Sequence, residues 1–283
     1  MKDSSEIDVL VVGAGAAGLT AALAAARAGQ TVVVVNKGQT GRSGATATIT
    51  GDISVDSRTI RERFNLMGDR GDSPETFFEE TLAGGAMLND TEIARTMCEE
   101  VAGDVADLLD SGLKVSGIGH APGHSVPRGV LVSGMQLLQI QTRRAVAAGV
   151  AFRDEFQAYG VLKEGRRAAG IVGVDLRTGR TRRMIARTVI LATGCGAMVH
   201  PFRTVPEELT GDGYRMTLEA GATLTDMEII RFLPCCLANP PLWRGIQFPW
   251  IIGPQSGTRA WLLNRYGERF MARYDPDRME QST

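Results

Sequence analysis

The sequence predicts an α/β fold with a doubly wound parallel sheet and a small antiparallel sheet, followed by the start of a second, α+β domain. Two runs of Val, Leu and Ile, 7–12 and 31–35, have the composition of strands that are buried on both faces. An Ala-rich segment, 19–28, lies between them and ends at Gly29, a typical helix stop. Together they form a β-α-β unit of about 30 residues, the length expected for two parallel strands joined by a crossover helix.

The rest of the chain alternates between loops, helical segments and short strands. A long stretch rich in Gly, Thr and Ser shows no helical period, so it is predicted to be a loop. The predicted elements, in chain order, are a loop over 38–52, two helices within 75–109 separated at Asn89 and Asp90, a loop over 117–128, a helix over 135–148, antiparallel strands over 162–165, 171–176 and 183–189, and a buried strand over 188–192 closed by Thr193 and Gly194.

The composition changes near residue 233, where prolines and tryptophans lie close together. We therefore predict two domains. The first, 1–232, contains the parallel sheet, and the second comprises 233–283. The sequence shows no internal repeat and no low-complexity segment.

Composition and charge exclude several classes of protein. Of the 283 residues, 43% are hydrophobic and 22% are charged, which is typical of a globular protein rather than a disordered one. The net charge of -1 argues against a nucleic-acid-binding surface. Acidic residues precede the first apolar run, unlike a signal peptide, and glycines interrupt the uncharged stretch 9–26. We therefore expect a cytoplasmic protein that is not inserted into a membrane.

The cysteines and histidines do not predict a metal site. Four cysteines and three histidines are scattered, without the spacing of zinc ligands. Cys235 and Cys236 are adjacent, and two interpretations stay open: buried thiols in a reducing compartment, or a redox-active vicinal pair. His120 and His124 lie on a loop containing Gly and Pro, where they either stabilise that loop or take part in catalysis.

One motif predicts the chemistry of the site. Residues 13–18, GAGAAG, fit the pattern GxGxxG directly after a strand and at the start of a helix. The first glycine allows a tight turn, the second lets the backbone approach a pyrophosphate, and the third permits close packing of the helix on the strand. The helix N-terminus offers N–H groups and a partial positive charge to phosphates. The motif therefore predicts a Rossmann-like, dinucleotide-binding domain.

The end of the second strand bears on which dinucleotide is bound. An Asp or Glu usually binds the adenosine ribose there, but this chain has Asn36, followed by Lys37. A neutral amide can still hydrogen-bond a ribose hydroxyl, yet it weakens the case for NAD. No second GxGxxG follows, which argues against a reductase with separate FAD and NAD(P)H sites. An NAD-binding dehydrogenase remains an alternative.

Several segments, taken in order, resemble the succinate dehydrogenase/fumarate reductase flavoprotein family, which also includes L-aspartate oxidase and the alpha chain of adenylylsulfate reductase. The resemblance runs over nearly the whole chain, and the ordered combination is more specific than any single motif. The matching segments are 8–18, 37–38, 42–51, the GHS-x-PR loop at 123–128, 191–194, the TGDG run at 210–213, 220–222, 226–228 and 264–271.

The resemblance implies that the chain binds FAD in an extended form. It implies that the segment 43–51 lines the isoalloxazine and pyrophosphate, that Asp212 contacts the cofactor, and that Gln157 and Ala158 meet the adenine. The residues so assigned to the cofactor are Gly13, Ala14, Gly15, Ala16, Ala17, Gly18, Asn36, Lys37, Gly38, Arg42, Ser43, Gly44, Ala45, Thr46, Thr48, Thr50, Gly51, Gln157, Ala158, Ala192, Thr193, Gly194 and Asp212.

The first departure from the family concerns how FAD is attached. In the membrane-bound succinate dehydrogenases a histidine bonds covalently to the flavin, and the aligned residue here is Gly44. Because glycine has no side chain, the resemblance implies non-covalent FAD, and a flavin that is less oxidising than a histidyl flavin.

A second departure concerns the substrate. Leu233 stands where the family has a substrate-binding histidine, and residues 256–260 replace the family's R-G-E-G-G run. A dicarboxylate needs cationic and hydrogen-bonding groups, which Leu233 does not supply, so succinate and fumarate are disfavoured as substrates. Arg231, Trp243 and Arg244 are candidate replacements.

The third departure is that the chain stops at Thr283, before the Arg-Asp pair whose arginine moves the proton in the family. No catalytic residue is therefore assigned within this chain, and we expect a fragment. The resemblance implies that residues 233–283 are the incomplete beginning of a substrate-capping domain, and a chain that supplies the missing part is one candidate partner. Two functions stay open. One is an FAD-dependent oxidoreductase that transfers a hydride between FAD and a small organic acid or related unsaturated substrate. The other is a flavin-binding electron-transfer subunit without turnover of its own, working with an iron-sulfur or other electron-transfer partner.

Overall fold

The structure is a computed structural model that describes residues 7–121, 123–231, 236–243, 261–277 and 279–281. It divides into two compact units. The first comprises the described residues of Met1–Ile49 and Gly134–Ile246, and the second those of Thr50–Ser133 and Gln247–Thr283. The predicted domain boundary after residue 232 falls on residues outside the described ranges, so it stays a prediction.

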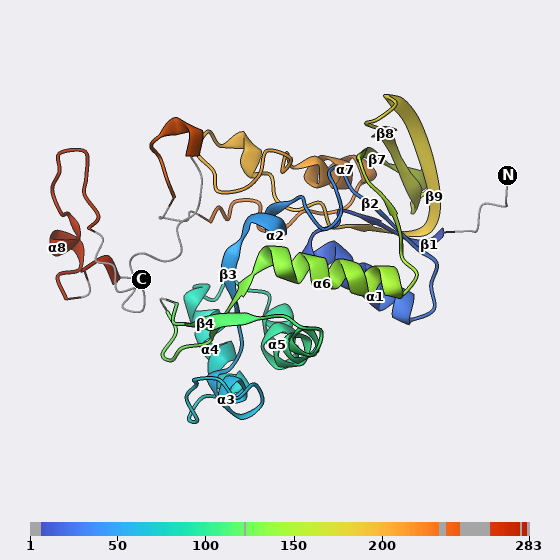
Figure 1. Ribbon diagram of the computed structural model, residues 1–283. Coiled ribbons are helices and arrows are strands. Elements are labelled where there is room, and N and C mark those ends of the chain that lie inside the picture. The colour runs from blue at the N-terminus through green and yellow to red at the C-terminus, as the bar shows by residue number, and fades with distance from the viewer. Residues whose placement is uncertain (1–6, 122, 232–235, 244–260, 278, 282–283) are drawn as a thin grey trace. The chain divides into compact units, whose positions relative to one another are not determined.

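The first unit consists of a sheet with helices on both faces, shown in Figure 1. Its elements are β1 (Ile7–Val12), α1 (Ala16–Arg27), β2 (Val32–Val35), α2 (Ala45–Thr48), α6 (Gly134–Ala147), β6 (Ala151–Arg153), β7 (Phe156–Glu164), β8 (Arg167–Asp175), β9 (Arg180–Leu191), α7 (Asp212–Ala220) and the 3-10 helices Ala197–Val199 and Pro241–Trp243. The predicted strands over 7–12 and 31–35 and the helix over 135–148 are present. The first helix begins earlier than predicted, at Ala16.

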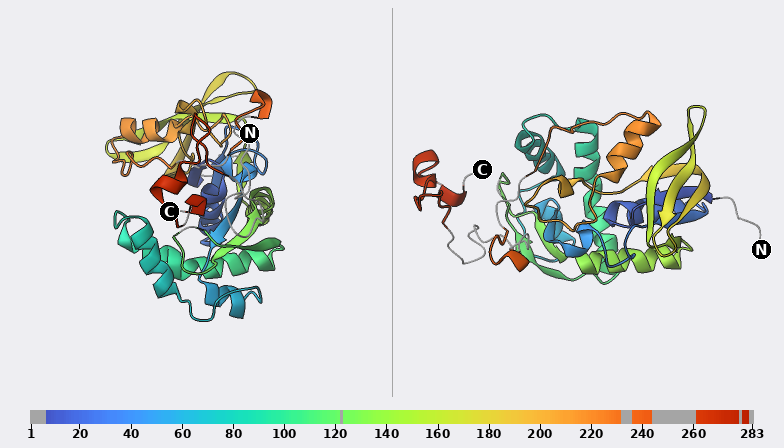
Figure 2. Two further views of the ribbon diagram at one scale, coloured as in Figure 1. Left: turned by 90° about the vertical axis from the view of Figure 1, so that its left-hand side faces the viewer. Right: turned by 90° about the horizontal axis from the view of Figure 1, so that it is seen from above.

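The six-stranded sheet of this unit has the order β6-β2-β1-β9-β8-β7. Strands β6, β2, β1 and β9 are parallel, whereas β8 runs antiparallel to both β9 and β7. This arrangement confirms the predicted α/β class with its parallel sheet and its antiparallel strands. The antiparallel strands form a twisted ribbon, visible in both views of Figure 2.

Strand β9 belongs to both parts of the sheet. Its first half, Arg180 to Ile185, pairs with β8, and its second half, Ala186 to Leu191, pairs with β1. The predicted strands over 183–189 and 188–192 are therefore one continuous strand. The halves looked separate because the Arg-rich first half is mostly exposed, whereas the second half lies against β1 in the middle of the sheet.

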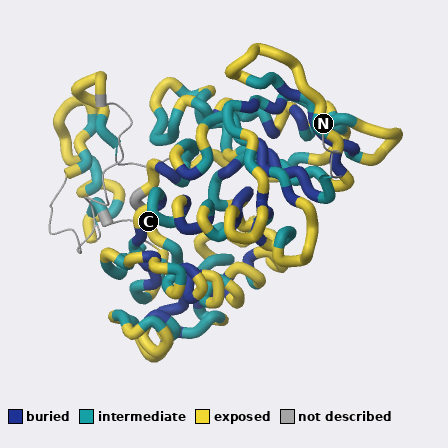
Figure 3. Tube along the Cα trace, turned by 45° about the vertical axis from the view of Figure 1, so that its right-hand side comes forward, coloured by how far each residue is buried: buried dark blue, intermediate teal, exposed yellow. Residues whose placement is uncertain are grey.

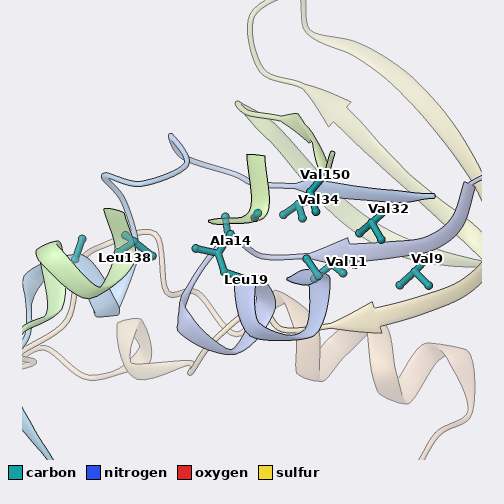
Figure 4. Close-up of a cluster of buried hydrophobic side chains, with 11 residues drawn as sticks. Val9, Val11, Ala14, Leu19, Val32, Val34, Leu138 and Val150 are labelled. Atoms are coloured by element: carbon teal, nitrogen blue, oxygen red, sulfur yellow. The ribbon is translucent and has the colours of Figure 1, made fainter. Parts of the chain in front are cut away.

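Alternate residues of β1 fill two different cores. Val9 and Val11 pack with Leu19 of α1 and Leu138 of α6 on one face of the sheet, as the close-up in Figure 4 shows. Leu10 and Val12 pack on the other face, in a cluster that includes Met216 of α7. Because side chains alternate across a strand, this pattern explains why the run is apolar at every position. Figure 3 shows the buried residues running through these central strands.

The second unit contains a three-stranded antiparallel sheet of order β3-β5-β4 and several helices. Its elements are β3 (Thr50–Ser54), α3 (Ser57–Glu62), α4 (Pro74–Gly84), α5 (Thr91–Asp110), β4 (Val115–Gly119), β5 (Gly129–Ser133), α8 (Met271–Tyr274) and the 3-10 helix Met279–Gln281. The predicted break between two helices at Asn89 and Asp90 is confirmed. The Asp90 carboxylate caps α5 by accepting hydrogen bonds from the N–H groups of Glu92 and Ile93, both at 3.0 Å.

Two predicted loops contain regular structure instead. The stretch 38–52 includes the single-turn helix α2 and the beginning of β3, and the stretch 117–128 includes the end of β4. One helical turn is too short to show a helical period. The strands β3 and β4 owe their regularity to backbone pairing with β5, which their Gly- and Ser-containing sequences do not reveal.

Candidate cofactor site

A cavity of about 240 Å³ lies in the first unit where β1, β2 and β9 end. Ligands of doubly wound sheets bind at the carboxyl ends of the strands, so this is the expected place for one. The lining residues are Val12, Gly13, Ala14, Gly15, Ala16, Ala17, Val35, Asn36, Lys37, Gly38, Ser43, Gly44, Ala45, Thr46, Phe156, Gln157, Ala158, Ala192, Thr193, Gly194, Glu208, Leu209 and Asp212.

The glycine-rich turn is built by close backbone contacts. Gly13 has a φ of +111°, and a Cβ there would lie 2.2 Å from the carbonyl oxygen of Ala192. A Cβ on Gly18 would lie 1.9 Å from the carbonyl oxygen of Gly13. Gly13 requires glycine because the turn packs directly on the end of β9, and Gly18 because α1 packs directly on the turn.

The second glycine of the motif faces the cavity instead. The nearest atom to a Cβ on Gly15 would be Thr46 Oγ1 at 3.6 Å, an ordinary contact distance. Gly15 is the N-cap residue of α1 and has no side chain that could cap the helix. The Ala16 N–H donates to Thr46 Oγ1 at 3.1 Å. The N-terminus of α1 and its partial positive charge therefore lie at the cavity.

The strand end that was expected to bind ribose is tied to the next loop. Asn36 Nδ2 donates to Ser43 Oγ at 3.3 Å. The Asn36 backbone is fixed as well, because its N–H donates to the Arg153 carbonyl and its own carbonyl accepts from the Phe156 N–H. The Asn36 side chain is thereby held at the cavity wall.

Three charged side chains line the cavity. Lys37 Nζ donates to Asp212 Oδ2 at 2.6 Å and to Thr210 Oγ1 at 2.8 Å. Glu208 Oε1 accepts a hydrogen bond from the Gly44 N–H at 2.8 Å. The pair of Lys37 and Asp212 joins the end of β2 to the start of α7, and the contact of Glu208 joins the loop before α2 to the segment before α7.

Most residues predicted for the site meet at this cavity, but five of the predicted ones are not among its lining residues. Gly18 packs within the turn, the Arg42 N–H bonds the Gln39 carbonyl, and Thr48 Oγ1 bonds the Ala45 carbonyl. Thr50 and Gly51 belong to β3 of the second unit, so this cavity does not test their assignment.

Five lining residues were missed by the sequence analysis: Val12, Val35, Phe156, Glu208 and Leu209. Val12 and Val35 are the last residues of the two buried strands, so the predicted strand ends could have placed them at the cavity. Phe156, Glu208 and Leu209 carry no local motif, because their positions depend on how distant segments fold onto the sheet.

The GHS-x-PR loop lies in the second unit and surrounds a buried cation. The Arg128 side chain is fully buried, and its Nε and Nη2 donate to the two Asp72 carboxylate oxygens at 2.8 Å and 2.7 Å. Its Nη1 donates to Glu80 Oε2 at 2.5 Å and lies 3.3 Å from His124 Nδ1. His120 Nε2 lies 2.6 Å from the His124 carbonyl oxygen. In this structure both histidines therefore make contacts that stabilise the loop.

These contacts set the protonation of the cluster. Burial by itself raises the pKa of Glu80, but hydrogen bonds from Arg128 and Ser125 outweigh it and lower that pKa to about 2. The pKa of Asp72 is also lowered, because hydrogen bonds from Arg128 and the Ser57 N–H outweigh burial. Burial, followed by the charge of Arg128, lowers the pKa of His124. The cluster is thus two carboxylates around one guanidinium, with a neutral imidazole beside them at pH 7.

The predicted departures on the substrate side fall mostly outside the described residues: Leu233, Arg244 and the stretch 256–260. Cys235 of the vicinal pair lies outside them as well. Of the candidate replacements, Arg231 is exposed at the end of a described range, and Trp243 closes a 3-10 helix. None of the helices within the described ranges is long and apolar enough to span a membrane.

The fold and the glycine-rich cavity define a dinucleotide-binding protein, and comparison with known proteins gives its family. A family model described as FAD binding domain matches residues 8–282. This chain belongs to that FAD binding domain family, whose cofactor is FAD. The resemblance to the succinate dehydrogenase/fumarate reductase flavoproteins is confirmed as well.

The relatives are oxidoreductases of that group. A fumarate reductase (CoM/CoB) subunit of Methanothermobacter marburgensis is 28% identical over 282 residues, which cover 96% of this chain and 49% of the relative. L-aspartate oxidase of Mycobacterium tuberculosis is 32% identical over 279 residues, with coverages of 95% and 50%. The solved structure of Mycobacterium smegmatis Sdh1 in complex with UQ1 is 28% identical, with a TM-score of 0.81 and coverages of 97% and 48%. The chain therefore spans about half the length of the proteins it matches.

The residues at the cavity fit the middle part of FAD. The α1 N-terminus and the open side of Gly15 offer room and N–H groups for a pyrophosphate. The cavity volume of about 240 Å³ is below the roughly 300–1,000 Å³ typical of ligand pockets. A complete dinucleotide would therefore extend beyond the cavity.

Proposed function

We propose that this chain is the FAD-binding part of an oxidoreductase that transfers a hydride between non-covalent FAD and a small organic acid or a related unsaturated compound. The observation that carries the proposal is the cavity at the ends of β1, β2 and β9, where the glycine-rich turn and the α1 N-terminus meet. Bound FAD would supply the hydride chemistry at its isoalloxazine N5. The protein would hold and orient it.

Each wall of the cavity suits one part of the cofactor. The backbone at Gly15 and the α1 N-terminus would bind the pyrophosphate. The fixed amide of Asn36 would hydrogen-bond the adenosine ribose, and the backbone at Gln157 and Ala158 would meet the adenine. Asp212, oriented by Lys37, would make a further polar contact.

The local structure around Gly44 supports non-covalent binding. Gly44 has a φ of +88°, and a Cβ built on it would have no atom within 4 Å. No His, Cys or Tyr is among the described residues that line the cavity. A covalent bond to a flavin needs a nucleophilic side chain of such a type, and this part of the site offers none.

We further propose that succinate and fumarate are not the substrates, because Leu233 replaces the family's histidine. Several relatives are named as subunits, which favours an electron-transfer partner, such as an iron-sulfur protein, for this chain too. The alternative is an electron-transfer flavoprotein without substrate turnover, in which the flavin only passes electrons to that partner.

Reoxidation of the reduced flavin tests the proposal. FAD-loaded protein would be reduced by dithionite without oxygen, mixed with a panel of small unsaturated acids, and followed by visible absorbance. Reoxidation by one acid with matching product formation supports the oxidoreductase. Reoxidation by none of the acids would contradict substrate turnover by this chain and favour the electron-transfer alternative.

A further inference from the structure

We propose that Glu208 weakens the binding of FAD at this site. Its carboxylate occupies a backbone N–H group inside the cavity and places an unpaired negative charge where an anionic cofactor has to bind. This inference rests on the proposed function, since it concerns the same cavity.

The first support is the contact between Glu208 and Gly44. Glu208 Oε1 lies 2.8 Å from the Gly44 nitrogen, and both residues line the cavity. A Cβ on Gly44 would have no atom within 4 Å, so the space beside this residue is open. The N–H of Gly44 would otherwise be free to donate to a cofactor oxygen. In the structure the carboxylate takes that donor.

The second support is the charge of the cavity wall. The charged lining residues are Lys37, Asp212 and Glu208. Lys37 and Asp212 neutralise each other through their 2.6 Å ion pair. Glu208 forms no ion pair with any residue that the structure describes. The wall therefore carries one uncompensated negative charge, and the pyrophosphate of FAD brings two more.

Repulsion between these charges acts at reduced dielectric. Side chains that line a protein cavity are only partly solvated, so charges there interact more strongly than in bulk water. Cofactor binding must then either displace Glu208 from Gly44 or tolerate the carboxylate nearby. Both routes cost more free energy with the charged carboxylate than with a neutral side chain, because only the carboxylate repels the pyrophosphate.

The adjacent residue provides a matched control. Glu207 is not among the residues that line the cavity: its Oε1 lies 3.1 Å from Arg203 Nη2, and its side chain is 83% exposed. Removing its charge changes the net charge of the chain by the same amount as removing that of Glu208. The removed charge lies at the cavity in one variant, and in an exposed ion pair with Arg203 in the other.

The test is the dissociation constant for FAD, measured by flavin fluorescence with the cofactor-free 283-residue chain. Glu208→Gln keeps an oxygen that can accept from Gly44 but removes the charge. We expect it to bind FAD about fivefold more tightly than the unmodified chain at low ionic strength. Glu207→Gln is expected to match the unmodified chain. High salt should reduce the difference in FAD affinity between Glu208→Gln and the unmodified chain, because salt screens the repulsion.

Unchanged or weaker FAD binding by Glu208→Gln, with an unchanged melting temperature of the cofactor-free chain, would overturn the inference, since Glu208 would then only position the loop. Should that variant be unstable, Glu208→Ala replaces it with the same expected gain in affinity. A chain that binds no FAD in any of these forms would overturn the proposed function itself, and this inference with it.

Discussion

Gly13 and Gly15 belong to one turn but have different surroundings. Gly13 has a positive φ and would place a Cβ 2.2 Å from the Ala192 carbonyl oxygen, whereas Gly15 has a φ of -75° and only Thr46 Oγ1 near it, at 3.6 Å. The first is therefore required by the packing of the turn on β9. The second has room for a side chain in the structure, so we propose that the cofactor entering the cavity is what requires glycine there.

Alanine at these two positions should have opposite effects. Gly13→Ala is expected to lower the free energy of unfolding by about 3 kcal/mol, because both the backbone conformation and the space disfavour a side chain. Gly15→Ala is expected to leave the stability of the cofactor-free chain nearly unchanged but to weaken FAD binding. Urea unfolding and FAD titration measure the two effects. A Gly13→Ala chain as stable as the unmodified one would contradict this account of the turn.

Site residues inside motifs could be predicted from sequence, and those outside could not. The turn 13–18 has its own spacing, so the sequence alone indicates its role. Glu208 is one of two adjacent acids that look alike in the sequence, yet one bonds the Gly44 N–H and the other pairs with Arg203. The two acids can be told apart only once the loop that carries Gly44 has folded against the segment before α7.

Helices and strands that are specified by a local sequence signal could also be predicted. The break between α4 and α5 was readable from Asn89 and Asp90, because a capping aspartate is a local signal. The sheet formed by β3, β5 and β4 was not, because its strands are short and Gly-containing and gain their regularity from pairing across the chain. The continuity of β9 was missed for a similar reason.

The elements of the second unit are held together by Arg128. It joins β5, where the loop ends, to Glu80 of α4 and to Asp72, which also accepts from the Ser57 N–H of α3. Arg128→Met is expected to lower the free energy of unfolding by about 3–5 kcal/mol, because it leaves the buried Asp72 charge without its partner. Chemical unfolding of the variant and the unmodified chain would measure this loss.

A surface pair serves as the control for that variant. Arg95 pairs with Glu75, with side chains 42% and 57% exposed. Because exposed ion pairs contribute little, Arg95→Met is expected to cost less than about 1 kcal/mol. Equal losses for the two variants would show that the Arg128 cluster has no special structural role.

The cluster also predicts how stability depends on pH. The Glu80 pKa is lowered from 4.5 to about 2 in the folded chain. Its contribution to stability is therefore fully present above pH 4.5 and is lost as the pH falls toward about 2, because the unfolded chain takes up the proton first. The urea midpoint should fall over this range, and less steeply in Glu80→Gln. An equally steep fall of the urea midpoint in Glu80→Gln would contradict the contribution assigned to Glu80.

At the scale of the whole molecule, the described lining of the cavity lies within one unit. Every described lining residue belongs to Met1–Ile49 or Gly134–Ile246. The chain nevertheless matches only about half the length of its relatives, 49% and 50% for the two named above. FAD binding is therefore the property to expect of this chain by itself, ahead of any turnover.

The central claim is that residues 1–283 bind FAD without a covalent bond, and the visible absorption spectrum of the purified chain before and after acid precipitation tests it most directly. We expect a flavin spectrum that moves entirely into the supernatant once the protein is precipitated. Flavin colour retained in the pellet would contradict the non-covalent site at Gly44, and a chain that takes up no FAD even when it is added would contradict the cofactor site itself.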